Sequence, residues 1–162
     1  MKRKIIFMAL AATIGLSACS QNKSGKTPTE TKQNNQKQVK EKKMKVTELT
    51  ADVFKKQVMD YEKHPNEWVF EGERPAVIDF YATWCGPCKA TAPVIDELAG
   101  VYDGKVDFYK VDVDKQEELA ALFGVRSIPT LLFVPKTGKP SMQVGAMNRQ
   151  QLEDAIKSTL LK

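Results

Sequence analysis

Two cysteines separated by two residues, Cys85 and Cys88, constrain this 162-residue chain more than any other feature. They follow an apolar run over 75–81 that predicts a buried strand, and they precede a segment with helical periodicity. The two thiols therefore flank the start of a helix. A spacing of two residues lets the sulfurs close and reopen a small disulfide ring.

The same cysteine spacing also occurs in half of a zinc site, which needs two further ligands. The chain offers only one other cysteine, Cys19, and one histidine, His64. Both lie outside the region into which the cysteine pair would fold. The ligand count therefore favours redox chemistry over metal binding, and we expect no metal site.

Residues 1–18 have the pattern of an export signal. Basic residues at 2–4 precede an apolar run over 5–16, which is shorter than the ~20 residues that span a membrane. The run ends in Leu-Ser-Ala-Cys at 16–19, which resembles the lipobox of bacterial lipoproteins, where the cysteine is lipidated. An ordinary small-residue cleavage site with a chance cysteine is the alternative. Lipidation of Cys19 would account for the third thiol, because an odd thiol in an exported protein needs an explanation.

Residues 19–45 are expected to form a tether that begins at the lipidated cysteine. From 20 to 45 the composition is polar and almost free of large apolar residues, which predicts disorder. This stretch carries a net charge of +6 and the signal +3, so the +5 of the whole chain leaves −4 for 46–162. The basic charge thus belongs to the tether, which argues against nucleic-acid binding by the folded part. A basic tether would rest against anionic lipid head groups, and solubilising charge alone is an equal alternative.

The remaining residues, 46–162, suit one domain with one core. Apolar periodicity predicts the element order βαβαβαββα, which implies a mixed sheet with helices on both faces. Thr50 and Asn148 are the expected N-caps of the first and last helices, the latter in a capping box with Gln151. The expected strands cover 46–49, 76–81, 106–112, 130–134 and 142–144, and the expected helices cover 51–63, the cysteine motif to about 102 with a kink at Pro93, 115–123, and the segment after Asn148.

From about residue 46 to its end, the chain resembles a thioredoxin. The matching segments, in the order and at the separations of that family, are 79–82, 84–89, 110–112, 126–130 and 144–146. The resemblance implies an α/β thioredoxin fold with a central mixed sheet flanked by helices on both faces. The chain departs from the family at Tyr81, where many members carry tryptophan, at Ser127, where glycine is usual, and in a longer loop over 66–74.

The expected catalytic residues are Cys85, Cys88, Asp79 and Lys110. Cys85 would lie at a helix N-terminus, where free backbone amides and the helix dipole favour the thiolate, so it is the expected nucleophile. Cys88, one turn further and more shielded, is the expected resolving thiol. Burial of Asp79 would raise its pKa and let it exchange protons with Cys88, unless the strand end exposes it. The family has an acid in this role, with a nearby lysine that Lys110 matches.

The residues expected to contact substrate are Trp84, Gly86, Pro87, Ile128, Pro129 and Gly145. The resemblance implies that Pro87 influences how readily the disulfide is reduced. It also implies that Ile128–Pro129 is a cis-proline pair that offers backbone to a substrate strand. Trp84 would contact partners, with core packing as the alternative. Gly145 would permit close substrate approach, with a plain turn as the alternative.

These features predict a monomeric, lipid-anchored thiol–disulfide oxidoreductase that faces the periplasm or cell exterior and reduces disulfides of exported proteins. It would need no cofactor besides the Cys85–Cys88 pair. Gly86-Pro87 resembles the reducing branch of the family. The chain has no nucleotide or flavin motif, so a membrane electron donor or a thioredoxin reductase would resupply electrons. The alternatives are an oxidant of the same fold, which introduces disulfides, and a redox-independent protein-binding module.

Overall fold

The computed structural model describes residues 46–162 of the chain. The predicted signal peptide over 1–18, the lipidation of Cys19 and the tether over 19–45 all lie outside the described residues and stay predictions. Within 46–162, no helix combines the length and the apolar character needed to cross a membrane.

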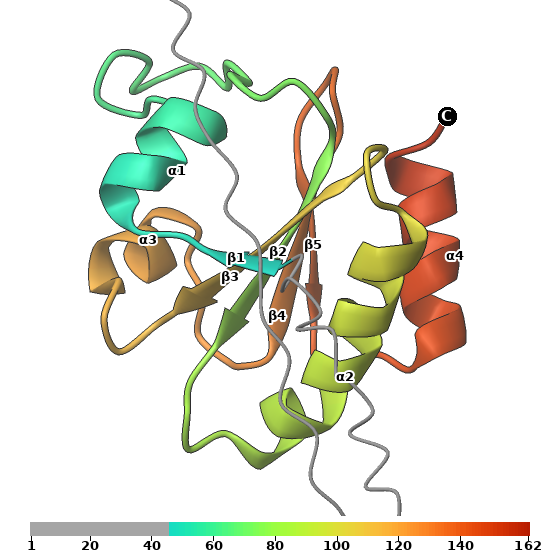
Figure 1. Ribbon diagram of the computed structural model, residues 1–162. Coiled ribbons are helices and arrows are strands. Elements are labelled where there is room, and N and C mark those ends of the chain that lie inside the picture. The colour runs from blue at the N-terminus through green and yellow to red at the C-terminus, as the bar shows by residue number, and fades with distance from the viewer. Residues whose placement is uncertain (1–45) are drawn as a thin grey trace, which may run out of the picture. The chain divides into compact units, whose positions relative to one another are not determined.

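The strands of the described residues form one mixed sheet with the order β1-β3-β2-β4-β5 (Figure 1). Strands β1, β3 and β2 run parallel, whereas β4 is antiparallel to β2 and β5 is antiparallel to β4. The predicted element order and the mixed sheet are therefore confirmed. The strands are β1 (Val46–Glu48), β2 (Ala76–Tyr81), β3 (Asp107–Asp112), β4 (Thr130–Val134) and β5 (Ser141–Val144).

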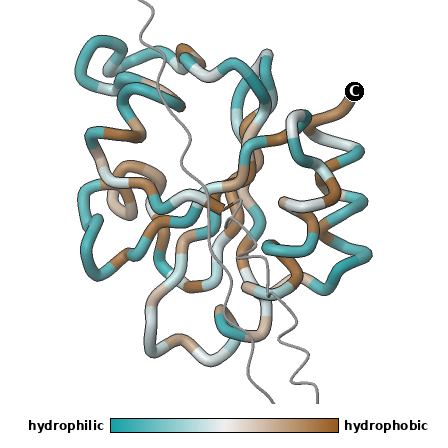
Figure 2. Tube along the Cα trace, in the orientation of Figure 1, coloured by the Kyte–Doolittle hydropathy of each residue, from teal (hydrophilic) through white to brown (hydrophobic). Residues whose placement is uncertain are grey.

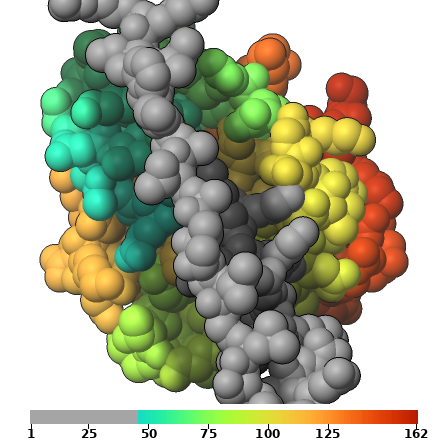
Figure 3. Space-filling view, viewed as in Figure 1, coloured from blue at the N-terminus to red at the C-terminus, as the bar shows by residue number. Residues whose placement is uncertain are grey.

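Helices cover both faces of the sheet, with α1 and α3 on one side and α2 and α4 on the other (Figures 1 and 3). Alternate residues of the central strands supply two apolar cores: Val77 packs with the α2 and α4 side, and Ile78 with the α1 and α3 side. Hydrophobic positions accordingly follow the strands in Figure 2. The helices are α1 (Ala51–Gln57), α2 (Gly86–Val101), α3 (Glu117–Leu122) and α4 (Arg149–Thr159).

Both predicted N-caps are confirmed. The Thr50 side chain accepts the Val53 N–H at 3.3 Å at the start of α1. At α4, Asn148 and Gln151 form the capping box, in which each side chain accepts the backbone N–H of the other at 3.0 Å. Helix α2 continues through Pro93 to Val101, close to the predicted end at about 102, and the predicted kink at Pro93 stays a prediction.

Helix α1 ends at Gln57, so the prediction of a helix over 51–63 is wrong in its second half. The cause is a local competitor for the backbone. Asp60 Oδ1 accepts the N–H groups of Glu62 and Lys63, each at 3.2 Å, and this turn replaces the helical hydrogen bonds. The chain then continues to β2 without a further helix or strand among the described residues.

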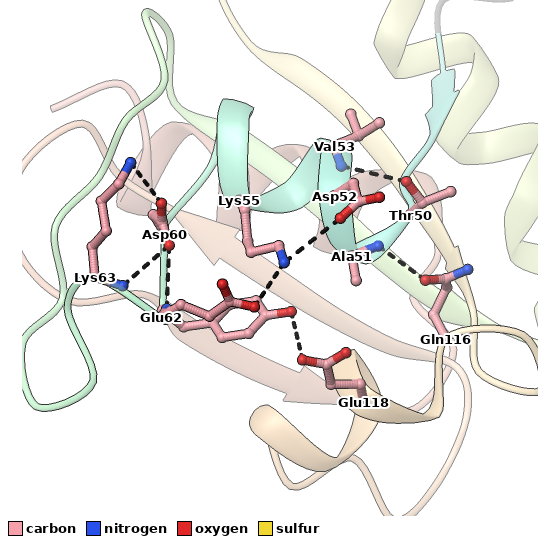
Figure 4. A network of polar contacts seen from close by, with 11 residues as sticks. Thr50, Ala51, Asp52, Val53, Lys55, Asp60, Glu62, Lys63, Gln116 and Glu118 are labelled. Carbon is pink, nitrogen blue, oxygen red and sulfur yellow. Dashed lines mark hydrogen bonds and ion pairs between the residues drawn. The ribbon is translucent and has the colours of Figure 1, made fainter.

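The long α1–β2 loop, residues 58–75, is held against α3 by polar contacts, drawn in Figure 4, and by aromatic contacts. The Tyr61 hydroxyl donates to Glu118 Oε1 at 2.8 Å. The ring of Trp68 packs edge-on against Phe123, whose centroid lies 6.3 Å away. These contacts extend the core on the α1 and α3 side beyond the helices themselves.

Candidate active site

A disulfide joins Cys85 and Cys88, whose Cα atoms are 5.3 Å apart. Cys85 is the N-cap of α2, and its Sγ accepts the Cys88 N–H at 3.1 Å. Pro87 lies in the first turn, where a helix needs no N–H donor from it. The predicted position of the cysteine pair at a helix N-terminus is therefore confirmed, and Gly86 and Pro87 between them are exposed.

The two cysteines are equally buried in this disulfide form, with exposed fractions of 4% for Cys85 and 3% for Cys88. The expectation that Cys88 is the more shielded thiol does not hold here. Both side chains pack with Ala82, and the partly buried Ile128 adjoins the same cluster. Joined by one bond in one small cluster, the two sulfurs share nearly the same environment.

The peptide bond between Ile128 and Pro129 is cis, as the resemblance implied. Pro129 O accepts the Gly145 N–H at 2.8 Å, which connects this loop to the end of β5. Gly145 has φ +101°, a backbone conformation that residues other than glycine rarely adopt. The cysteine pair, the cis-proline loop and the end of β5 thus lie at one end of the sheet.

Trp84 is exposed, with an accessible fraction of 68%, so core packing as its role is wrong. Its Nε1 donates a hydrogen bond to Asp114 Oδ2 at 2.8 Å. Sequence reasoning missed Asp114. The available signal was its position just after β3, because parallel strands β2 and β3 place their carboxyl ends at the same sheet edge.

A groove of about 180 Å³ lies beside this exposed indole. It brings the tryptophan of the cysteine motif together with the cis-proline loop. Such a groove can receive a short segment of another chain next to the disulfide. Its lining residues are Trp84, Val113, Val125, Arg126, Ser127 and Ile128.

Asp79 is buried in the central strand β2, with an exposed fraction of 5%. The alternative of an exposed strand end is therefore wrong. Its Oδ1 has no hydrogen-bond partner. Burial raises the pKa of the carboxyl to about 7, although the positive charge of Lys110 acts to lower it. A group with a pKa near neutrality can both accept and release a proton at physiological pH.

Lys110 is the β3 residue paired with Asp79 across the parallel strands β2 and β3. Its Nζ lies 5.6 Å from the centroid of the Tyr81 ring, within cation–π range. Tyr81, one of the departures from the family pattern, thus covers the lysine that accompanies the buried acid. Burial also raises the pKa of the Tyr81 hydroxyl.

No cluster of three or more histidine, cysteine, aspartate or glutamate side chains within 46–162 is arranged to hold a metal ion. Within that range, His64 lies in the loop after α1, whereas the cysteine pair begins α2. The site is thus built from a disulfide, a buried carboxyl and an exposed groove.

Comparison with known proteins agrees with this geometry. The family model described as Thioredoxin matches residues 45–158. The thioredoxin of Borreliella burgdorferi is 48% identical over 109 residues, which cover 67% of this chain and 92% of that protein. Thioredoxin 1 of a Nostoc species is 36% identical over 113 residues, or 70% and 95% of the two chains. The thioredoxin of Haemophilus influenzae is 48% identical over 88 residues, or 54% and 82%.

A solved structure of chloroplastic thioredoxin z superposes with a TM-score of 0.57 at 23% identity, covering 71% of this chain and 94% of that one, which shows the shared fold. The sequence relatives and the cysteine pair at disulfide distance identify the activity as that of a thioredoxin-type protein-disulfide oxidoreductase. By its match over residues 45–158 and its similarity to these proteins, the chain belongs to the thioredoxin family.

Proposed function

We propose that this protein works as a reductant of disulfides in exported proteins, held at a membrane by a lipid on Cys19. The observation that carries the catalytic part is the cysteine pair at the start of α2, next to the exposed groove at Trp84 and Ile128. A substrate segment in that groove would bring its disulfide to the N-cap cysteine. Gly86-Pro87 between the cysteines supports the reducing direction by its resemblance to reducing members of the family.

In the first step, the thiolate of Cys85 attacks one sulfur of the substrate disulfide. A bond forms between Cys85 Sγ and that sulfur, the substrate S–S bond breaks, and the second substrate sulfur leaves as a thiolate that takes a proton from water. The N-cap position stabilises the attacking thiolate, because the amides of the first helical turn and the helix dipole favour negative charge there.

In the second step, the Cys88 thiol gives its proton to the Asp79 carboxylate, and its sulfur attacks Cys85 Sγ. The mixed disulfide breaks and the remaining substrate sulfur leaves as a thiolate. The domain ends in its disulfide form, and two electrons have passed to the substrate. The pKa of Asp79 near 7 supports the proton transfer, since the carboxyl can be ionised before the step and protonated after it.

A second dithiol must then return two electrons and two protons to the Cys85–Cys88 disulfide. The exchange uses only cysteine sulfur on this chain and therefore needs no cofactor. For an anchored protein, a membrane protein with a reactive dithiol is the proposed donor. A soluble thioredoxin reductase is the other donor class.

Reduction of insulin, followed by the turbidity of the released chains, tests the catalytic proposal. We expect Cys85→Ser to abolish turnover and Cys88→Ser to accumulate mixed disulfides, seen as a higher-mass band on a non-reducing gel that disappears after reduction. Undiminished activity of Cys85→Ser would contradict the assignment of the nucleophile. The redox state of the Cys85–Cys88 pair in living cells tests the direction of electron flow. A mostly reduced pair supports the reductant, and a mostly oxidised pair supports the oxidant of the same fold.

The lipid anchor rests on the sequence pattern at 16–19, which lies outside the described residues. Cells grown with a labelled fatty acid test it. We expect label and membrane association in the natural protein and loss of both in Cys19→Ser. Label that persists in Cys19→Ser, or a soluble natural protein, would remove the anchor from the proposal and leave the thiol chemistry in place.

A further inference from the structure

Strand β5 presents a row of apolar side chains to solvent. Met142 and Val144 are exposed to 43% and 59%, and alternation along the strand places them on the same face. Met142 pairs with Leu132 of β4, whose side chain belongs to the core covered by α1 and α3. The two exposed residues thus lie on the α1 and α3 face, where those helices leave the last strand uncovered. Pro140, two positions before Met142, directly precedes the strand and is half-buried. We call Pro140, Met142 and Val144 the β5 row.

One end of the β5 row opens into a pocket of about 630 Å³. Three parts of the chain build it: the long α1–β2 loop, the end of α3, and the turn between β4 and β5. Its volume falls in the range that ligand pockets usually have. Glu67 and Lys139 bring opposite charges to it, so the lining does not select a charged ligand. The apolar lining residues are Met59, Pro65, Trp68, Leu122, Phe123 and Pro140.

The other end of the β5 row reaches the active site. Val144 is followed by Gly145, whose N–H donates to Pro129 O in the cis-proline loop. Between Pro140 and Gly145 the chain advances about 17 Å at roughly 3.4 Å per residue. The β5 row therefore spans about this length, from Pro140 in the pocket lining to the residue before Gly145 at the cis-proline loop.

We propose that the β5 row and its pocket form an accessory docking surface for the disulfide-containing protein substrate. A substrate segment in extended conformation would place its half-cystine at Cys85 and, about five residues away, an apolar side chain in the pocket. We assign the protein substrate as the occupant because the β5 row ends at the cis-proline loop, which a protein substrate must approach to reach the cysteines. The inference rests on the proposed function, and it deepens it by naming the substrate class: unfolded or loop segments with an apolar residue at that spacing.

Disulfide-linked peptides test this surface with the full-length protein. Two pairs are compared, each carrying Leu or Ser five residues from the cysteine, before it in one pair and after it in the other. We expect the natural protein to reduce one Leu peptide with a kcat/KM about 5-fold above its Ser partner, from partial burial of one Leu side chain. Met142→Asp and Leu122→Asp should bring that ratio near one. Val101→Asp, an exposed apolar residue at the end of α2, is the matched control and should keep the ratio.

The outcomes separate this surface from the proposed function. Equal rates for Leu and Ser peptides in both pairs, or an unchanged ratio in both Asp variants, would overturn the surface while insulin reduction continued. Should Met142→Asp fail to fold, Met142→Gln and Leu122→Asp answer the same question. A natural dimer that Met142→Asp dissociates, with no Leu preference, would assign the row to a second copy and also overturn the proposal. Insulin reduction by Cys85→Ser would instead contradict the proposed function on which this docking surface rests.

Discussion

Asp79 and Lys110 lie directly opposite each other on strands β2 and β3, yet the lysine only partly offsets the burial of the carboxyl. Desolvation is the largest influence and raises the pKa of Asp79 from 3.8 to about 7. Burial in β2 thus disfavours the charged form of the Asp79 carboxyl. An acid kept in this state has measurable consequences both for stability and for the pH dependence of thiol exchange.

Replacing the buried acid with asparagine should stabilise the protein above neutral pH. Between pH 3.8 and about 7 the unfolded carboxyl is ionised and the folded one is protonated, so stability falls as pH rises through this window and stays low above it. Asp79→Asn should therefore gain at most about 4 kcal/mol at pH 8 relative to its effect at pH 4. Urea unfolding at both pH values measures this, with exposed Asp96→Asn as the control. An equal effect of Asp79→Asn at the two pH values would contradict the raised pKa.

Removing the positive charge of Lys110 should shift the pH dependence of resolution by Cys88 to higher pH. Lys110 lowers the pKa of Asp79, so Lys110→Met should raise that pKa further. The rate at which Cys88 resolves a mixed disulfide, measured against pH by rapid quenching, should then rise at a higher pH than in the natural protein. Lys105→Met, in the turn before β3, is the control. A midpoint that stays in place or falls would contradict the prediction that Lys110 lowers the pKa of the proton acceptor.

The exposed indole at the active site should serve protein substrates and contribute little to the fold. Trp84→Ala should lower kcat/KM for insulin severalfold and leave the reduction of a small aromatic disulfide unchanged. Its free energy of unfolding should change by no more than about 0.5 kcal/mol, because the side chain is 68% exposed. Asp114→Ala, which removes the hydrogen-bond partner of Nε1, should have an intermediate effect on insulin. Equal losses for insulin and the small disulfide would assign Trp84 to the chemistry itself.

Most of the fold could be predicted from local sequence signals. The capping box at Asn148 involves residues three positions apart, and the N-cap position of Cys85 follows from a strand that meets a helix. Neither depends on distant parts of the chain, so the sequence alone was sufficient to predict them. The cis bond before Pro129 is different, because an X–Pro sequence does not distinguish cis from trans. That prediction depended on the resemblance to a family.

One local turn and several contacts between distant residues were harder to predict. Apolar spacing continued the first helix past Gln57, whereas the Asp60 side chain closes a turn that lets Tyr61 reach α3. The partner of Trp84, Asp114, is 30 residues away in the sequence and becomes a neighbour only through parallel pairing of β2 and β3. Burial of Asp79 was expected with an exposed strand end as the alternative, because its burial depends on the central place of β2 between β3 and β4, which are distant in the sequence.

The hydrogen bond between Tyr61 and Glu118 should be one of the contacts that hold the α1–β2 loop on α3. Tyr61→Phe removes the donor and keeps the ring, so it should lower the free energy of unfolding by about 0.5–1 kcal/mol. Burial, followed by this bond, raises the pKa of Tyr61 to about 12, so the hydroxyl remains a donor up to at least pH 10 and the loss should be the same at pH 7 and pH 9. Urea unfolding at pH 7 and pH 9 measures this loss.

Glu118→Ala removes the acceptor of the same hydrogen bond, and Glu117→Ala is its control. The double variant Tyr61→Phe with Glu118→Ala should lose less than the two single losses combined, because both substitutions remove the same bond. Fully additive losses would show that the loop is held by its aromatic packing alone.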